Sequence, residues 1–272
     1  MRLASGHLYP VKSLGGVDVD RADVQSWGLR HDRRWLVLRP DGRKLSSGVL
    51  PALLGLTAAP GSGSVTLTAR DGSSLTVAEP VDGPPVPTDV SRLDTVRLAA
   101  DEAHDWLSAR LGRPRLAWLD DPRRRPMSAE SGGWPGDPLN LSDAGPLLVT
   151  TAPSLRRLRD WIAEGALERG EPAPEPTAMA RFRPTVVLDG PIEPFAEDGW
   201  TRVRIGAVDF RVSERCDRCS VTLIDPATLA RGKEPIRTLA RHRRYDGKTW
   251  FGVRLVPLTT GEIRVGDPVA VS

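Results

Sequence analysis

Two cysteines, the only ones among the 272 residues, stand three positions apart as Cys216 and Cys219. Arg215 and Arg218 each precede one of them, and a β-branched run follows the second cysteine. This spacing is compatible with a zinc site, with disulfide exchange, or with a centre that holds a softer metal. Whatever thiol chemistry the protein performs takes place in this segment.

The alternatives for the cysteine pair differ in what they need from the rest of the chain. A structural zinc site needs four ligands, usually a second CxxC or a pair of histidines. The four histidines are not paired in the sequence: His7, His31, His104 and His242. A thioredoxin-like pair lies at the start of a helix, whereas residues 220–224 predict a strand directly after Cys219. Buried structural thiols are a further alternative, and the residues alone leave the choice open.

Composition limits the setting of this site. The net charge is +3, and 34 of the 38 basic residues are arginines scattered through every segment. Basic residues are not clustered with aromatic ones on one face, so no nucleic-acid partner is expected. No apolar run approaches the roughly 20 residues that span a bilayer, so no membrane association is expected. Two cysteines are too few for a disulfide framework and no apolar segment follows Met1, which predicts a cytoplasmic location.

The elements that must position these residues are expected to be mainly β-strands, with a few helices. Asp41-Gly42 and Asp71-Gly72 predict hairpin turns. Short strands about every ten residues favour a barrel or a sandwich. Apolar or alternating runs predict strands at residues 7–11, 34–38, 65–68 and 74–77.

Two segments show the apolar spacing of helices. The first covers residues 101–111 and ends at Gly112, and the second covers 154–166 with Ser154 as its N-cap. The stretches 120–138 and 170–176 are expected to be loops because they are rich in Pro, Gly and charged residues. A domain boundary is expected between residues 113 and 127.

A series of short blocks, in the same order along nearly the whole chain, resembles a known family, the MOSC proteins. MOSC stands for the C-terminal domain of molybdenum cofactor sulfurase. The blocks are Leu8 to Ser13, Gly28 to Val37, Arg181 to Pro184, Phe195 to Trp200, Cys216 to Asp225, Lys233 to Pro235, Phe251 to Val253 and Ile263 to Val269. The resemblance implies a mainly β fold, with an N-terminal β-barrel domain over residues 1–115 and a β-barrel MOSC domain over 116–272.

The functional relatives implied are the mitochondrial amidoxime-reducing component and its bacterial counterparts. In those enzymes, molybdenum bound to a pyranopterin dithiolene (the Mo-molybdopterin cofactor) takes a protein thiolate as ligand and reduces N-hydroxylated substrates. The resemblance therefore implies a molybdenum cofactor and a small-molecule N-hydroxylated or N-oxide substrate. It also implies a separate electron-transfer partner of the ferredoxin, flavodoxin or cytochrome b5 type. Two alternatives are a persulfide sulfur carrier for metal-sulfur cluster or cofactor assembly, and non-catalytic binding or storage of the molybdenum cofactor.

The family's thiolate ligand matches Cys219, which the resemblance makes the metal ligand and a catalytic residue, with Cys216 as an outer neighbour. Asp217 is the second catalytic candidate; Asp217 and water are both possible as the proton donor near the metal, and the sequence does not rank them. The pyranopterin carries a phosphate and a polar ring, which need cations and hydrogen-bond donors. The implied cofactor-binding residues are Lys12, Ser13, Arg33, Asp143, Ala144, Arg183, Thr185, Asp217, Arg218 and Cys219. The four basic and hydroxyl residues Lys12, Ser13, Arg33 and Arg183 converge only if the two domains share one cleft.

Three features depart from the family pattern. Thr185 stands where the family commonly has Asn, and a hydroxyl cannot reproduce the paired donor and acceptor of a carboxamide. Residues 46–51 lack the arginine of the family's Thr-x-Arg-x-x-Pro segment. Some bacterial relatives append a ferredoxin-like domain whose [2Fe-2S] cluster needs four cysteines. This chain ends at Ser272 without them, so electrons are expected to arrive from a separate protein.

Overall fold

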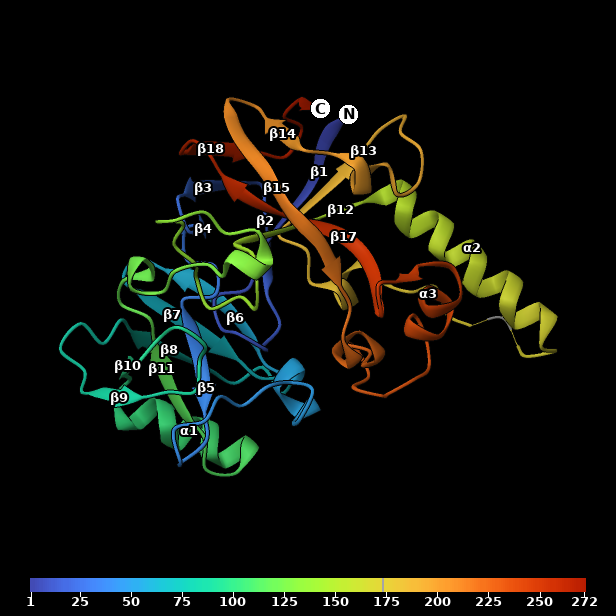
Figure 1. Cartoon of the computed structure of the whole chain (residues 1–272). Helices are drawn as coiled ribbons and strands as arrows, with labels where there is room; N and C mark the ends of the chain where they lie inside the picture. The colour runs from blue at the N-terminus through green and yellow to red at the C-terminus, as the bar shows by residue number, and fades with distance from the viewer. Residues whose placement is uncertain (173) are drawn as a thin grey trace. The chain divides into compact units, whose positions relative to one another are not determined.

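The computed structural model describes residues 1–172 and 174–272. The chain divides into two compact units, each assembled from separate stretches of sequence. Unit 1 comprises Met1–Gly6, Asp20–Gln25 and Leu147–Ser272, and unit 2 comprises His7–Val19 and Ser26–Pro146. In the described part of the chain strands predominate and three α-helices occur (Figure 1). The expectation of a mainly β protein with few helices is confirmed.

Unit 1 is built around one sheet, in which the hydrogen-bonded order is β19, β14, β15, β17, β12, β13 and β1, and β2 (Val17–Val19) follows β1 in the same order. Neighbouring strands pair antiparallel except β12 and β13, which are parallel. A parallel pair needs a long crossover connection, and helix α2 (Ala152–Glu168) provides it. The strands are β1 (Arg2–Leu8), β12 (Leu147–Thr151), β13 (Val186–Asp189), β14 (Arg202–Ile205), β15 (Val208–Asp217), β17 (Lys248–Pro257) and β19 (Val269–Val271).

Main-chain hydrogen bonds also link the start of β1 to the segment that leads into β19. The N–H of Leu3 donates to the carbonyl of Asp267 (3.0 Å), and the carbonyl of Leu3 accepts from the N–H of Gly266 (2.8 Å). The N–H of Val269 donates to the carbonyl of Met1 (3.0 Å). The first strand of the chain therefore lies beside the segment that leads into the last one, and Figure 1 shows the two chain ends close together.

The remaining elements of unit 1 are short. Strand β3 (Arg21–Gln25) pairs with β18 (Gly261–Arg264), and β16 (Arg244–Tyr245) forms a hairpin with β17. Helix α3 (Ile236–His242) packs against α2 and β17. Three single turns of 3-10 helix also belong here: η4 (Met179–Phe182), η5 (Ala196–Gly199) and η6 (Ser220–Leu223).

Unit 2 contains two sheets, of order β5, β11, β10, β9 and of order β6, β7, β8. Helix α1 (Asp101–Leu111) packs against β11 and β8. Three 3-10 turns complete it: η1 (Pro51–Gly55), η2 (Pro122–Arg124) and η3 (Ala129–Ser131). The strands are β2 (Val17–Val19), β4 (Gly28–Leu29), β5 (Trp35–Leu38), β6 (Thr57–Gly61), β7 (Ser64–Thr68), β8 (Ser74–Ala78), β9 (Pro85–Pro87), β10 (Thr95–Leu98) and β11 (Arg115–Trp118).

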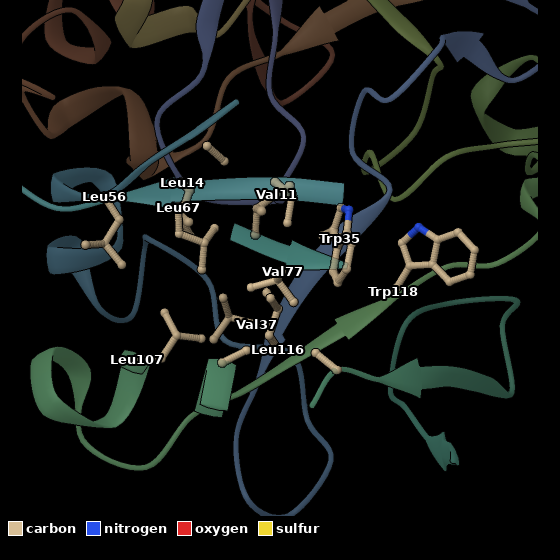
Figure 2. Packing of buried hydrophobic residues seen from close by; sticks show 14 of the residues in the cluster. Val11, Leu14, Trp35, Val37, Leu56, Leu67, Val77, Leu107, Leu116 and Trp118 are labelled. Carbon is tan, nitrogen blue, oxygen red and sulfur yellow. The ribbon is translucent and has the colours of Figure 1, made fainter. Parts of the chain in front are cut away.

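Strand β5 has both faces buried and so joins the two apolar clusters of unit 2. Trp35 and Val37 point into a cluster that also takes side chains from β7, β8, β11 and α1 (Figure 2). Leu36 and Leu38 belong to the other cluster, with residues of β10 and β11. Burying each such side chain contributes about 1.5–3 kcal/mol. A continuous apolar run, rather than a strict alternation, is the pattern expected of a strand covered on both sides.

Several sequence predictions for unit 2 are confirmed. The helix over residues 101–111 has these same bounds and is capped by Gly112, which adopts a φ of 93°. The Asp71-Gly72 turn joins β7 to β8, and the Asp41-Gly42 turn brings the residues after it back along β5.

The predicted strand at residues 7–11 is wrong in its limits, since β1 covers Arg2–Leu8. Its pairing with β13 begins at Arg2, and the N–H that Pro10 lacks could not continue the ladder.

The second predicted helix is longer than expected and begins earlier. Its N-cap is Thr151, whose hydroxyl accepts from the N–H of Ser154 (3.2 Å). Pro153 lies within the first turn, where its missing N–H has no intrahelical partner to lose.

No described helix is both long and apolar enough to cross a membrane. The loop expected at 120–138 contains η2 and η3, and residue 173 of the loop expected at 170–176 lies outside the described residues.

Candidate functional site

The two cysteines lie where the paired strands β15 and β17 come apart. The register of this pair shifts between Arg215 and Asp217, on either side of Cys216. Opposite, Gly252 adopts a φ of 79°, and a side chain there would approach the carbonyl of Val149 to 2.6 Å. Only glycine is accommodated at such a position. This irregularity ends the ladder and begins the loop that follows β15.

Cys216 is buried, with 5% of its surface exposed. Its Sγ accepts a hydrogen bond from Nη1 of Arg218 (2.8 Å), and Nη2 of the same guanidinium donates to the carbonyl of Phe182 (2.8 Å). Both cysteines are free thiols. Arg218 thus ties the buried cysteine to the end of η4, and the thiol of Cys216 takes part in a contact inside the protein.

Cys219, in contrast, is exposed and comes directly before η6. Its carbonyl accepts from both the N–H (3.2 Å) and the Oγ1 (2.9 Å) of Thr222. The strand predicted for residues 220–224 is therefore wrong. β-branched residues favour strands through packing against neighbouring strands, and here the Thr222 hydroxyl closes a local turn instead. The case against a thioredoxin-like pair now rests on Cys216, which lies in a strand and not at the start of a helix.

The segment that contains η4 is fastened to the cysteine loop from a second side. Nη2 of Arg181 pairs with Oδ2 of Asp225 (2.7 Å), and Nη1 donates to the carbonyl of Leu223 (3.3 Å). Arg183 follows η4 with a φ of 54°, a conformation that is uncommon for a residue with a side chain. Such backbone strain gathers at functional sites. The structure therefore places Arg183 on the segment that Arg181 and Arg218 hold against the cysteine loop.

Thr185 is fully buried and its hydroxyl is engaged within the fold. The hydroxyl accepts from the N–H of Leu148 (2.9 Å) and donates to the Leu148 carbonyl (3.0 Å). Its single O–H donor is therefore in use. This geometry gives Thr185 the role of joining η4 to β12, and it does not support a contact from its hydroxyl to a cofactor.

Arg254 forms a clamp on the strand that leads to the cysteines. Its guanidinium pairs with Glu214 (2.5 Å) and with Asp217 (2.7 Å). Burial alone would raise the pKa of Asp217, but the hydrogen bond and the charge of Arg254 outweigh burial and hold this pKa below 3.8. Asp217 is therefore ionised at neutral pH. A carboxylate in this state accepts a proton and does not readily supply one.

The side chains of the described residues do not by themselves form a metal cage. No group of three or more His, Cys, Asp or Glu side chains in the part of the chain that is described could hold a metal ion. A closed zinc site of four protein ligands is therefore not built there. A metal at Cys219 would take one thiolate from the protein and its other ligands from elsewhere.

Unit 2 gathers the other basic candidates around a loop at residues 140–144. Nζ of Lys12 donates to the carbonyl of Leu141 (2.7 Å) and pairs with Oδ1 of Asp143 (2.6 Å). Burial lowers the pKa of Lys12 below 10.5, while the charge of Asp143 opposes this change. Ala144 follows, half-buried. The structure therefore brings Lys12, Asp143 and Ala144 together within one unit.

Arg33 joins this arrangement, and both Arg33 and Ser13 have a positive φ. Arg33 has a φ of 47° and Ser13 a φ of 74°. The N–H of Arg33 donates to the carbonyl of Tyr9 (2.9 Å), its carbonyl accepts from the N–H of Leu141 (2.9 Å), and its guanidinium pairs with buried Asp32. Arg33 is thus fixed on both sides, and its main chain contacts the same loop as Lys12.

Arg125 is a site residue that the sequence analysis missed. Its side chain, in a residue only 3% exposed, donates to the carbonyls of Ser91 (3.0 Å), Ser142 (2.8 Å) and Asn140. Burial lowers its pKa to about 10, since carbonyl partners do not compensate a buried charge as a carboxylate would. Arg125 therefore fixes the 140–144 loop through hydrogen bonds from a buried side chain. It lies in the Arg123-Arg124-Arg125-Pro126 run, which the composition did not distinguish from ordinary loop.

The fold and this segment define a mainly β protein with one buried and one exposed cysteine at CxxC spacing, and comparison with known proteins agrees with this class. The MOSC domain matches residues 137–270, and the MOSC N-terminal beta barrel domain matches residues 1–114. The chain belongs to the MOSC family.

The mitochondrial amidoxime-reducing component 1 of Mus musculus is 31% identical, over 96% of this chain and 79% of its own length. The protein of the same name from Homo sapiens is 30% identical, over 96% and 80%. The molybdenum cofactor sulfurase of Danio rerio is 30% identical over 91% of this chain. The chain spans 31% of the length of that sulfurase.

Proposed function

We propose that the chain is a molybdenum-cofactor-dependent reductase of N-hydroxylated or N-oxide compounds, and that Cys219 is its metal ligand. The observation that carries the proposal is the asymmetry of the two thiols. Cys216 is buried against Arg218, whereas Cys219 is exposed at the head of a turn that fixes its main chain. Relatives named amidoxime-reducing component, similar over nearly the whole chain, support the choice of reaction.

The donor set fits a molybdenum cofactor. A single soft thiolate suits a metal whose other ligands are the sulfurs of a dithiolene. The phosphate and polar ring of such a cofactor need cations with several donors. The proposal assigns Arg183 and Arg218 of unit 1 to this task, and on the family resemblance also Lys12, Ser13 and Arg33 of unit 2. When bound, the cofactor supplies two-electron redox chemistry that a protein side chain cannot provide.

The overall reaction takes up two electrons and two protons. The N–O bond of the substrate breaks and its oxygen leaves as water. The nitrogen of an N-hydroxylated substrate gains a hydrogen, whereas that of an N-oxide regains only its lone pair. The part of the protein is to present the Cys219 thiolate and to hold the substrate oxygen near it. Because Asp217 is ionised at neutral pH, the proposal takes the protons from solvent at the exposed loop and assigns Asp217 to charge compensation of Arg254.

The electrons come from a separate carrier protein in this proposal. A [2Fe-2S] cluster needs four cysteine ligands, and the chain has two cysteines, one of them buried against Arg218. Ferredoxin, flavodoxin and cytochrome b5 types are the classes of donor to be tested. The proposal places the reaction in the cytoplasm, where a thiol such as Cys219 stays reduced.

Metal analysis of two cysteine variants tests the proposal. Cys219→Ala is expected to lose bound molybdenum and the reduction of benzamidoxime with a chemical electron donor. Cys216→Ala, the matched control, is expected to retain most of the metal. Equal metal content in the two variants would show that the ligand has been wrongly chosen, and wild-type protein without molybdenum would reject the function.

A second candidate function is sulfur carriage, with a persulfide on Cys219. The exposure of this thiol favours it, as does the similarity to proteins named molybdenum cofactor sulfurase. The two functions differ in what the purified protein contains. Stoichiometric molybdenum with a phosphate-bearing pterin supports the reductase, whereas cyanide-labile sulfur without molybdenum supports the carrier.

A further inference from the structure

The positive charge of the chain is concentrated around Cys219. Residues 214–248 contain nine Lys and Arg side chains and five Asp and Glu side chains, a net charge of +4. The whole chain has a net charge of +3. The other residues together therefore have a net charge of −1, so the excess of positive charge belongs to this one stretch.

Ion pairs neutralise four of the five carboxylates of this stretch, and the fifth, Asp246, is exposed in the β16–β17 hairpin between Arg244 and Lys248. Glu214 and Asp217 pair with Arg254, Asp225 with Arg181, and Glu234 with Arg237. Four of the exposed cations here have no carboxylate at ion-pair distance in the described part of the chain. These four are Arg231, Lys233, Arg244 and Lys248, and together they are called the basic rim.

Main-chain hydrogen bonds attach both halves of the basic rim to the cysteine loop. The N–H of Arg218 donates to the carbonyl of Thr249 (2.7 Å), next to Lys248 in the β16–β17 hairpin. The N–H of Gly232, which lies between Arg231 and Lys233, donates to the carbonyl of Leu223 at the end of η6 (2.9 Å). One half is therefore fixed just before Cys219 and the other just after η6.

The aromatic residues beside the rim are already covered by cations. The guanidinium of Arg215 lies 4.7 Å from the ring centroid of Tyr245 and 5.4 Å from that of Trp250, and Nζ of Lys248 lies 5.5 Å from Trp250. Tyr245 and Trp250 also stack on each other at 5.8 Å. Nucleic-acid sites use aromatic faces as stacking platforms for bases. Covered rings and four separated cations instead favour a protein partner with carboxylates on its surface.

We propose that the basic rim is the docking surface for an electron-carrier protein with an acidic face. This inference rests on the proposed function, which requires a separate donor, and it adds where the donor binds and which charge it presents. Complementary charge raises the association rate and sets the orientation of such a complex. Docking at the rim places the carrier next to Cys219, and two encounters with a one-electron carrier supply the two electrons of one turnover.

Charge reversal in pairs tests each half of the rim. The variants are Arg231→Glu with Lys233→Glu, and Arg244→Glu with Lys248→Glu. Arg21→Glu with Arg202→Glu is the matched control, because both of these arginines are exposed in unit 1 and the net charge changes equally. The probe is oxidised plant-type [2Fe-2S] ferredoxin, an acidic carrier, and calorimetry measures its Kd. Basic cytochrome c serves as the reversed probe.

Each rim pair is expected to weaken ferredoxin binding about tenfold or more, and the control pair to change it less than about twofold. Binding should weaken as ionic strength rises, because the contacts are exposed. Absence of ferredoxin binding, an equal effect of the control pair, or tighter binding of cytochrome c would overturn the proposal. Rim-dependent binding of duplex DNA in place of ferredoxin would also overturn it.

Binding is measured in parallel on Cys219→Ala, which separates this inference from the proposed function. Rim-dependent docking that persists in Cys219→Ala supports the surface, and the reductase is rejected only if the wild-type protein contains no molybdenum. If the wild-type chain reduces benzamidoxime with a chemical donor, and both rim-pair variants bind ferredoxin as tightly as the wild-type chain does, the reductase is supported and the docking surface is rejected.

Discussion

Replacing Arg254 by Met is expected to destabilise unit 1 more than any exposed arginine would, because Arg254 joins two carboxylates at the base of the cysteine loop. Its side chain is 12% exposed, and those of Glu214 and Asp217 are 21% and 43% exposed. Burial alone would lower the pKa of Arg254, yet the attraction of Cys216, Glu214 and Asp217 raises it above the usual value of an arginine. The folded state therefore favours the charged guanidinium.

The magnitude follows from how each partner is exposed. Removing one member of a fully buried pair costs about 3–5 kcal/mol, and an exposed pair contributes about 0–1 kcal/mol. Glu214 is nearer the first limit and Asp217 nearer the second, so we expect Arg254→Met to lower the free energy of unfolding by about 2–4 kcal/mol. Glu214→Gln should cost about 2 kcal/mol, and Asp217→Asn less than about 1 kcal/mol.

Urea unfolding at pH 7, followed by tryptophan fluorescence, measures these differences. The matched control is Arg204→Met, since Arg204 also makes two hydrogen bonds to a carboxylate, Asp209, but on the exposed face of the β14–β15 pair. It should leave the urea midpoint nearly unchanged. If the control costs as much as Arg254→Met, or if Asp217→Asn costs more than Glu214→Gln, burial does not set the strength of the clamp.

Three further predictions concern the fold. Burial, opposed by hydrogen bonds from Ser154 and Thr151, raises the pKa of Glu197 above 4.5. Its stabilising contribution is then present below pH 4.5 and is lost as pH rises toward the folded-state pKa. The stability of Glu197→Gln relative to wild type should therefore increase with pH in urea midpoints, and a constant difference would contradict this. Thr151→Val should cost about 1–2 kcal/mol by removing the cap of α2, while Thr151→Ser keeps most of the stability; equal losses would argue against the capping hydroxyl. Leu107→Ala, in the core of Figure 2, should cost about 2–5 kcal/mol in urea unfolding, and a loss below about 1 kcal/mol would mean that the cluster closes around the cavity.

The elements that the sequence predicted well are those with local causes. Helix α1 ends where Gly112 can adopt a positive φ, and the Asp71-Gly72 turn suits the hairpin between β7 and β8. Each of these signals lies within a few residues of the structure that it specifies. The mainly β class follows from many such signals in sequence.

The errors arise where distant residues decide the outcome. Residues 220–224 have strand propensity, but no strand in the described part of the chain pairs with them. Ile224 forms an isolated bridge to Arg231, and the Thr222 hydroxyl closes a turn. The start of α2 depends on Thr151, which also donates to buried Glu197 (3.3 Å). A pattern of single residues along the chain does not contain such contacts.

The features of the candidate site fall into the same two groups, those with a local sequence signal and those that depend on distant residues. The CxxC segment is visible in the sequence, but its asymmetry is not, because the burial of Cys216 depends on the Phe182 carbonyl and on Arg218. Arg125 and Arg254 look like two arginines among 34. Only the fold shows that one fastens the 140–144 loop and the other fastens β15. The cofactor roles of Lys12, Arg33 and Arg183 remain predictions.

The hydrogen bonds between β1 and residues 266–269 have a consequence for biosynthesis. A ribosome releases the chain from its N-terminus, so β1 emerges long before residues 266–269, which lie beside it in the finished sheet. Unit 2 has all of its residues outside the ribosome once Pro146 has emerged. The start of β1, in contrast, waits for its partners at residues 266–269 through most of translation, and an unpaired strand edge invites association with other chains. Aggregation of nascent chains that stall before residue 266 is therefore the vulnerability that this strand order creates.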